Sequence, residues 1–353
     1  MIKVQTRLLI LMATQVMNIV AAPSFFNSLR VPIFVKPVVA LGYDNNMFKF
    51  SSHEMEEMIP WDDALGNAET FDSEIVYPQI ELLYSPVFSL KHETNFRLTF
   101  GRALYSRSKE KSYSSFSLKF EYHLGIYQWL KVGYSLQPDL YLRPYRDGDA
   151  ISQELTPCGF ANETFYLSYS HPLTKRSWIM IKGRRINQYF KPSFTEFDTE
   201  IATGYLRFSA KPIKRLRTSV WLERGRGDNS TYDNGLATSG FNRSYRFDRV
   251  GIKTAWRFNK PSIKIELSVD SEIRYYVAEN SNDPLHSGRS HQDYRYKLLF
   301  QKEFIDGLAV VVDVRYRKRI TDSEFNWVTE LKSFQKTEFW LTFSYDLVWD
   351  LFY

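Results

Sequence analysis

The sequence has very little cysteine, no long apolar run and only a small excess of positive charge. Cys158 is the one cysteine among 353 residues, which excludes an internal disulfide and a CxxC metal or redox motif. No stretch approaches the roughly 18 apolar residues that a membrane helix needs, so a helical membrane protein is excluded. A formal net charge of +6 is weak support for nucleic-acid binding, which requires a concentrated basic face. The sequence also lacks a Gly-rich phosphate loop and a His, Cys and Asp cluster with metal-ligand spacing, so we expect no metal, no cofactor and no nucleic-acid partner.

Aromatic residues, by contrast, are abundant. The chain contains 23 Tyr and 27 Phe, yet its mean hydropathy of -0.37 is that of a water-soluble protein. This combination is typical of strands in which alternate residues face lipid and water, because the polar half cancels the apolar half in any window average.

The first 22 residues have the pattern of an export signal. Lys3 and Arg7 form a basic start, residues 8–12 an apolar centre, and Ala21 and Ala22 a small-residue end. We therefore expect a signal peptide over residues 1–22 and a single domain over residues 23–353, with an ordinary amphipathic N-terminus as the alternative. Removal of the segment would lower the net charge from +6 to +4, because it holds two cations and no anion.

The last sixteen residues, Glu338 to Tyr353, alternate between large apolar and polar side chains. This run predicts a strand much longer than the roughly 5 to 6 residues common in soluble proteins, as a bilayer-spanning strand requires. Its end resembles the C-terminal signal by which bacterial outer-membrane barrels are recognised by their assembly machinery. The resemblance is carried by Tyr345, Leu347, Trp349, Leu351 and Tyr353. It implies an outer-membrane location and the barrel-assembly machinery as a partner.

Similar alternation recurs along the chain and predicts about fourteen antiparallel strands, with twelve or sixteen as alternatives. Short connections that contain Pro, Gly or Asn alternate with long ones, as periplasmic turns alternate with outer loops in membrane barrels. The predicted short connections are residues 171–176, 210–215, 259–262 and 305–307, and the long ones are residues 44–72, 146–162, 225–243, 279–291 and 321–333.

The polar faces of these runs carry full charges at successive sites, as in the run from Ile263 to Val277. A soluble sandwich could not bury such charges in its core without partners. We therefore predict an all-β fold over residues 23–353, a transmembrane antiparallel up-and-down β-barrel with its apolar face outside. A soluble all-β protein is the alternative.

Charged residues in the final third of the chain form the main candidate site. Six cations are predicted to project into the outer half of the lumen from neighbouring strands: Arg249, Arg274, Arg295, Lys297, Arg315 and Arg317. Four carboxylates stand on the same strands as their potential partners: Glu266, Asp270, Glu272 and Asp313. Such a basic wall could attract anions. The alternative is an internal salt-bridge network that stiffens the barrel.

The lumen of a fourteen-strand barrel is too wide for its own side chains to fill. The long first connection is the expected constriction, and Ser51 with the acidic residues after it predicts a short helix there, which could equally lie on the surface. Residues 42–48, Gly-Tyr-Asp-Asn-Asn-Met-Phe, resemble a segment at the first hairpin of various outer-membrane barrels, including lipoprotein-export translocators. No helical repeat precedes the segment here, which disfavours a translocator.

These features favour a porin-like outer-membrane channel that passes small solutes by diffusion, with a preference for anionic ones. The alternative is a non-conducting barrel that serves as an anchor or interaction platform in an envelope complex. A lipid-modifying enzyme is less favoured, because the six histidines are scattered and no catalytic residue is expected. The expected partners are outer-membrane lipid and lipopolysaccharide, the assembly machinery and, for a platform, an envelope protein.

Overall fold

The computed structural model describes residues 28–57, 65–151, 154–259, 261–280, 282–304 and 307–350. The predicted signal peptide lies outside these ranges. Within them, no helix combines the length and hydropathy that crossing a membrane requires.

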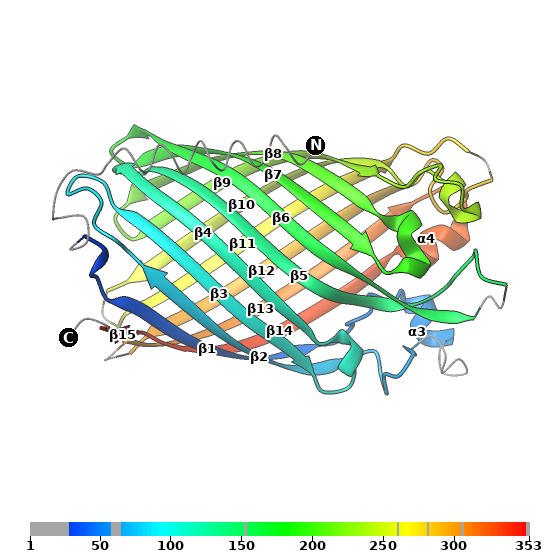
Figure 1. Cartoon of the computed structure of the whole chain (residues 1–353), viewed down its shortest axis with the longest axis horizontal. Helices are drawn as coiled ribbons and strands as arrows, with labels where there is room; N and C mark the ends of the chain where they lie inside the picture. Colours follow the sequence, from blue (N-terminus) through cyan, green and yellow to red (C-terminus); the bar gives the residue numbers. More distant parts are fainter. Residues whose placement is uncertain are drawn as a thin grey trace.

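The strands form a closed up-and-down barrel (Figure 1). Each strand pairs antiparallel with the next along the chain, and β14 returns to pair with β1, which leaves no free edge in the described part of the barrel. The strands are β1 (Ile33–Asp44), β2 (Ser73–Tyr84), β3 (Thr94–Tyr105), β4 (Tyr113–Gly125), β5 (Gln128–Arg146), β6 (Leu155–Thr174), β7 (Ser177–Phe190), β8 (Thr199–Ile213), β9 (Leu216–Asn229), β10 (Tyr245–Phe258), β11 (Ile263–Tyr276), β12 (Ser290–Glu303), β13 (Leu308–Asp322), β14 (Phe334–Tyr345) and the short β15 (Leu347–Trp349).

The two ends of the barrel differ, and we call them the loop end and the turn end. The loop end carries the longer connections, the first of which is loop L1 (residues 45–72), together with the short helices (Figure 1). The turn end carries the connection between β2 and β3 and a series of tight turns. The helices are α3 (Ser52–Glu57), the 3-10 helices η2 (Lys109–Lys111), η3 (Pro192–Phe197) and η4 (Ala237–Gly240), and α4 (Asn326–Lys332).

The prediction of a fourteen-strand up-and-down barrel is confirmed, with differences at strand ends. The predicted loops at residues 146–162 and 225–243 are shorter in the structure, because β6 begins at Leu155 and β9 continues to Asn229. The final strand is not continuous, since it breaks at Asp346 into β14 and β15. Pro37 of β1 lies next to this break and has no N–H to donate, and on the side of β13 the Asp346 N–H donates to the Gly307 carbonyl at 3.2 Å.

The outer surface of the barrel is apolar. Outward side chains such as Val250 (54% exposed) and Leu267 (52% exposed) are not covered by any other part of the described chain. The alternate, inward positions hold buried carboxylates, among them Asp270 and Glu272. Because a lipid-exposed strand must satisfy its backbone within a closed sheet, this inside-out arrangement is that of a transmembrane barrel, as the sequence predicts.

Several inward glycines allow aromatic rings to lie flat along the inner wall. A Cβ atom at Gly251 would lie 2.3 Å from the ring of Trp221, and one at Gly133 would lie 2.2 Å from the ring of Tyr166. Each glycine is the cross-strand neighbour of its aromatic residue. The ring therefore occupies the space above the glycine instead of standing out into the lumen.

Substitution of Gly251 by Leu should displace the Trp221 ring and destabilise the barrel by about 1–3 kcal/mol, since a side chain would enter filled space. Gly183 is the matched control, because it faces outward and nothing lies within 4 Å of a Cβ atom built there. Thermal unfolding in detergent, followed by the gel mobility of folded and unfolded protein, measures the effect. Equal midpoints for G251L and G183L would contradict this account of the glycine.

Candidate functional site

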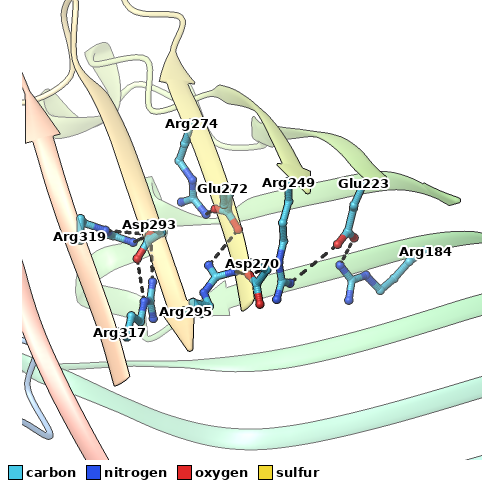
Figure 2. A network of polar contacts seen from close by, with 10 residues as sticks. All are labelled: Arg184, Glu223, Arg249, Asp270, Glu272, Arg274, Asp293, Arg295, Arg317 and Arg319. Atoms are coloured by element: carbon cyan, nitrogen blue, oxygen red, sulfur yellow. Dashed lines mark hydrogen bonds and ion pairs between the residues drawn. The ribbon is translucent and has the colours of Figure 1, made fainter. Parts of the chain in front are cut away.

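The inner wall near the loop end carries a network of ion pairs (Figure 2). Its centre is formed by Asp270 and Glu272 on β11. Arg249 Nε donates to Asp270 at 2.7 Å, and Arg295 reaches both carboxylates, with distances of 3.1 Å to Asp270 and 2.9 Å to Glu272. Arg274 donates to Glu272 at 3.0 Å. The register places Arg249 opposite Glu272, and Asp270 opposite Arg295, so strand pairing itself brings these groups together.

A second cluster surrounds Asp293 on β12 (Figure 2). Its carboxylate is 1% exposed and accepts hydrogen bonds from two arginines of β13. Arg317 binds with both Nε (2.7 Å) and Nη2 (3.1 Å), and Arg319 Nη2 lies at 2.8 Å. A two-pronged contact of this kind holds a guanidinium in one orientation. Asp293 of β12 and Arg319 of β13 were not among the predicted site residues.

The remaining predicted residues lie farther from the loop end. Asp313 is shared by Arg315 at 2.6 Å and Lys297 at 3.5 Å. Glu266 is shared by two lysines that were not among the predicted cations: Lys253 at 2.5 Å and Lys264 at 2.8 Å.

Glu223 on β9 extends the network beyond the predicted strands. It is buried and pairs with Arg184 of β7, and its other oxygen lies 3.9 Å from Arg249 (Figure 2). Each of the six predicted cations thus has at least one carboxylate partner. These cations are Arg249, Arg274, Arg295, Lys297, Arg315 and Arg317. A buried carboxylate needs such compensation, since removal of its partners would leave an unpaired charge away from water.

Loop L1 folds back onto the barrel at the seam between β1 and β14. Asn46 is buried and holds the loop with its side-chain amide, which donates to the carbonyls of Phe50 (2.8 Å) and Gln335 (3.0 Å). Its side-chain oxygen accepts the Phe50 N–H at 2.8 Å. Beside it, Lys336 of β14 pairs with Asp44 at 2.6 Å. The first loop is therefore fixed to the final strand.

The predicted helix in L1 is present as α3. Ser51 caps it, since Ser51 Oγ accepts the Glu54 N–H at 3.0 Å and Glu54 accepts the Ser51 N–H at 2.9 Å. Glu54 also pairs with Arg143 of β5 at 2.7 Å. This pair ties the helix to the barrel wall, so α3 is not simply a solvated surface helix.

An apolar cluster beneath L1 stabilises its folded position. Phe48 and Phe50 are buried together with Met47 and Tyr141 of β5. Lys111 of η2 lies over the Phe48 ring, with Nζ 5.0 Å from the ring centroid, and donates to the Tyr141 carbonyl at 2.8 Å. Cation–π contacts and backbone bonds of this kind hold the ammonium group in a largely apolar site.

Lys49 lies near the start of L1 and shares a cavity with residues of the ion-pair network. Its φ of 60° is unusual for a residue other than glycine. The side chain is exposed within a cavity of about 580 Å³ inside the barrel and forms no ion pair among the described residues. That cavity is also lined by five cations and two carboxylates of the wall: Arg295, Lys297, Arg315, Arg317 and Lys336, with Asp270 and Glu338.

The residues of the predicted assembly signal lie on the outer surface where the structure describes them. Tyr345, Leu347 and Trp349 are each 40% or more exposed, and Leu351 and Tyr353 lie outside the described residues. Lys36 of β1 pairs with Asp346 at 3.1 Å across the break in the last strand.

Two histidines near the loop end have polar partners. His286 contacts Asp283 at 2.8 Å, and His291 contacts the Thr321 hydroxyl at 2.8 Å. Neither ring has a hydrogen bond to a serine hydroxyl within the part of the chain that the structure describes. Within the described residues, no group of three His, Cys, Asp or Glu side chains is arranged to hold a metal ion.

No protein-family model matches the sequence, and no curated protein matches it. Solved outer-membrane proteins have a similar fold. A loop L8 deletion mutant of OmpT from Vibrio cholerae has a TM-score of 0.47 at 9% identity, over 89% of this chain and 98% of that one. The outer-membrane channel DcaP of Acinetobacter baumannii has a TM-score of 0.44 at 10% identity, over 89% and 97%. An anion-selective porin from Comamonas acidovorans has a TM-score of 0.41 at 8% identity, over 89% and 98%.

The folded position of L1 should depend on pH through Lys111, which lies outside the spanning strands. Burial and, next, the charge of Lys336 lower the pKa of Lys111 to about 7 from an ordinary value of 10.5. An undocked L1 would return the amine to water, so the undocked state binds more protons between these two values. Docking is therefore stabilised as pH rises above about 7 and loses this stability as pH falls.

Hydrogen exchange of residues 47–56, corrected for the intrinsic rate, should be roughly tenfold slower at about pH 8.5 than at about pH 6.5. The K111M variant should lose most of this dependence, and K109M, which changes an exposed lysine of the same helix, should keep it. Lys332 of α4 leaves a residual effect, because burial lowers its pKa to about 7 as well. An unchanged pH dependence in K111M would show that another group controls docking.

Proposed function

We propose that this protein is a bacterial outer-membrane channel through which small solutes diffuse. The observation that carries the proposal is a charged, water-accessible inner wall inside a closed barrel with an apolar outer surface. The side chains of Lys253 and Arg315 point inward and are still 45% and 44% exposed. Among the residues that the structure describes, neither L1 nor another segment fills the lumen around these two side chains, as a plug would.

L1 supplies the constriction and a preference for anions. Ion pairing cancels much of the charge of the wall, whereas Lys49 extends from L1 into the lumen without a carboxylate partner among the described residues. Desolvation and the charges of Arg317 and Lys336 lower the pKa of its amine, so its positive charge is greatest at low pH. An uncompensated charge at a narrow point controls ion selectivity more strongly than a paired one, since its field is not cancelled locally.

The outer-membrane location and the assembly partner belong to the same proposal. The apolar outer surface suits acyl chains, and the aromatic, outward positions of Tyr345 and Trp349 suit a recognition signal on the closing strand. In this orientation the turn end faces the periplasm and the loop end faces outside, where it meets lipopolysaccharide.

Planar-bilayer recording in a KCl gradient tests the channel and its selectivity. The wild-type barrel should conduct with a preference for chloride, and K49E should lower the ratio of anion to cation permeability several-fold, since inverting a nearby charge changes the energy of an ion by on the order of 1 kcal/mol. K318E is the matched control, because it makes the same change on the outward face of β13. A folded barrel that never conducts would overturn the channel proposal. Equal effects of K49E and K318E on the permeability ratio would show that Lys49 does not set the selectivity.

A non-conducting platform is the second candidate, and the packing of L1 at the loop end favours it. α3 contacts α4, and Val328 of α4 is fully buried, so two helical segments partly cover the mouth. A platform would present these helices to an envelope partner.

The N46A variant distinguishes the two candidates. Loss of the Asn46 bonds should release L1 from β14, which in a channel raises the mean conductance and produces more frequent transitions between levels. A platform with a sealed lumen would stay silent in both forms. N67A is the control, since Asn67 is exposed and bonds only to Glu110 at 2.6 Å at the surface.

A further inference from the structure

The inner wall of β7 to β10 near the turn end holds several cations that form no ion pair within the described residues. Four of them are Lys182, Arg207, Arg217 and Arg257. The strand register places all of them on the inward face, because Lys182 lies opposite Tyr205, Arg207 opposite Met180 and Trp221, and Arg217 opposite Ala255. None of them was among the predicted site residues.

Carboxylates near this group already have other partners. Glu223 lies closest to Lys182 along the wall and is shared by Arg184 and Arg249. Glu266 lies near Arg217 and is shared by Lys253 and Lys264. The positive charges of Arg207 and Arg257 both act on Arg217, so the four cations form one electrostatic group.

Aromatic rings hold these cations in place of carboxylates. Lys182 Nζ lies 4.7 Å from the centroid of the Tyr205 ring. Arg217 lies 4.7 Å from the centroid of Trp178, which is itself stacked on Tyr127 at 4.2 Å. A cation–π contact orients a cation but leaves its full charge, whereas an ion pair cancels it.

Arg207 is the centre of this group. Its Nη2 contacts the Met180 sulfur at 3.5 Å, a weak acceptor, and its Nε is buried without a hydrogen-bond partner. A guanidinium in this state has unused donors, and a fork of two N–H groups matches the oxygen pair of a phosphate or carboxylate.

We propose that Lys182, Arg207, Arg217 and Arg257 form a binding site for multiply charged oxyanions, and that phosphate-bearing solutes are the preferred cargo of the channel. The claim about cargo rests on the channel function proposed above. The binding site itself does not require that the barrel conducts. An oxyanion reaches the site through the lumen, since Arg217 and Arg257 are exposed there. It bonds to Arg207 and is surrounded by the remaining three charges.

The charge distribution gives the site a role in transport. Solutes that pass the ion-paired network near the loop end meet cations without carboxylate partners near the turn end. A site of this kind raises the local concentration of anions, and four separate cations let a solute leave by moving from one to the next.

Titration calorimetry with pyrophosphate, on the folded barrel in neutral detergent at low ionic strength, tests the site directly. The wild type should bind pyrophosphate, and R207Q should weaken binding at least about tenfold, because charge-assisted hydrogen bonds are lost. K119Q is the matched control: it removes one inward cation from β4, on a different part of the wall, and should weaken binding no more than about threefold. K182Q provides a second test in case R207Q fails to fold.

Recording pyrophosphate block of the chloride current separates this inference from the channel itself. Binding in detergent without any conductance would support the site and overturn the channel. Conductance in the wild type with neither binding nor block would overturn the site and leave the channel. Equal weakening by R207Q and K119Q would also overturn the site, since it would show a response to total charge alone.

Discussion

Closure of β14 on β1 is the constraint on which the rest of the structure depends. A barrel in lipid has no water to satisfy a free strand edge, so the last strand must pair with the first. The pairing of Val38 with Ser344 and of Val35 with Leu347 keeps one register on both sides of the break at Asp346. This register fixes which side chains face inward around the whole ring, because a shift by one residue would exchange the lipid and lumen faces. The charged interior is a consequence of it.

Within that interior, charge is compensated in two ways. Near the loop end, carboxylates such as Asp270 and Asp293 each accept bonds from two arginines, and every arginine of the network in Figure 2 has a carboxylate partner. Near the turn end, rings of Tyr205 and Trp178 take the place of carboxylates and leave Lys182 and Arg217 charged. The same side-chain type therefore stiffens the barrel at one end and attracts anions at the other. Counting cations along the strands does not separate these roles, because the difference lies in their partners.

The sequence predicted the strands well, because a period of two is local. It predicted the inward residues of β11 for the same reason, and the ion pairs of Asp270 and Glu272 followed once neighbouring strands were aligned. It failed where a contact depends on a distant segment. Asn46 and Gln335 are 289 residues apart, and no local pattern marks their bond. Arg207 was not among the predicted inward residues, and its lack of a carboxylate partner follows only from its register with β7 and β9, which places it opposite Met180 and Trp221.

The attachment of L1 links the constriction to the closing of the barrel. After Asp44, the chain continues along β14, where the Asn45 N–H donates to the Thr337 carbonyl at 3.2 Å and the Asn45 side chain accepts the Thr337 N–H at 2.7 Å. These partners belong to the last strand of the chain, so L1 cannot reach its folded position until β14 is in place. Lys49 therefore enters the lumen only in a closed barrel. An incomplete barrel lacks the folded position of L1 as well as its seam, and the selectivity that we propose for Lys49 would be set by the same step that removes the free edges.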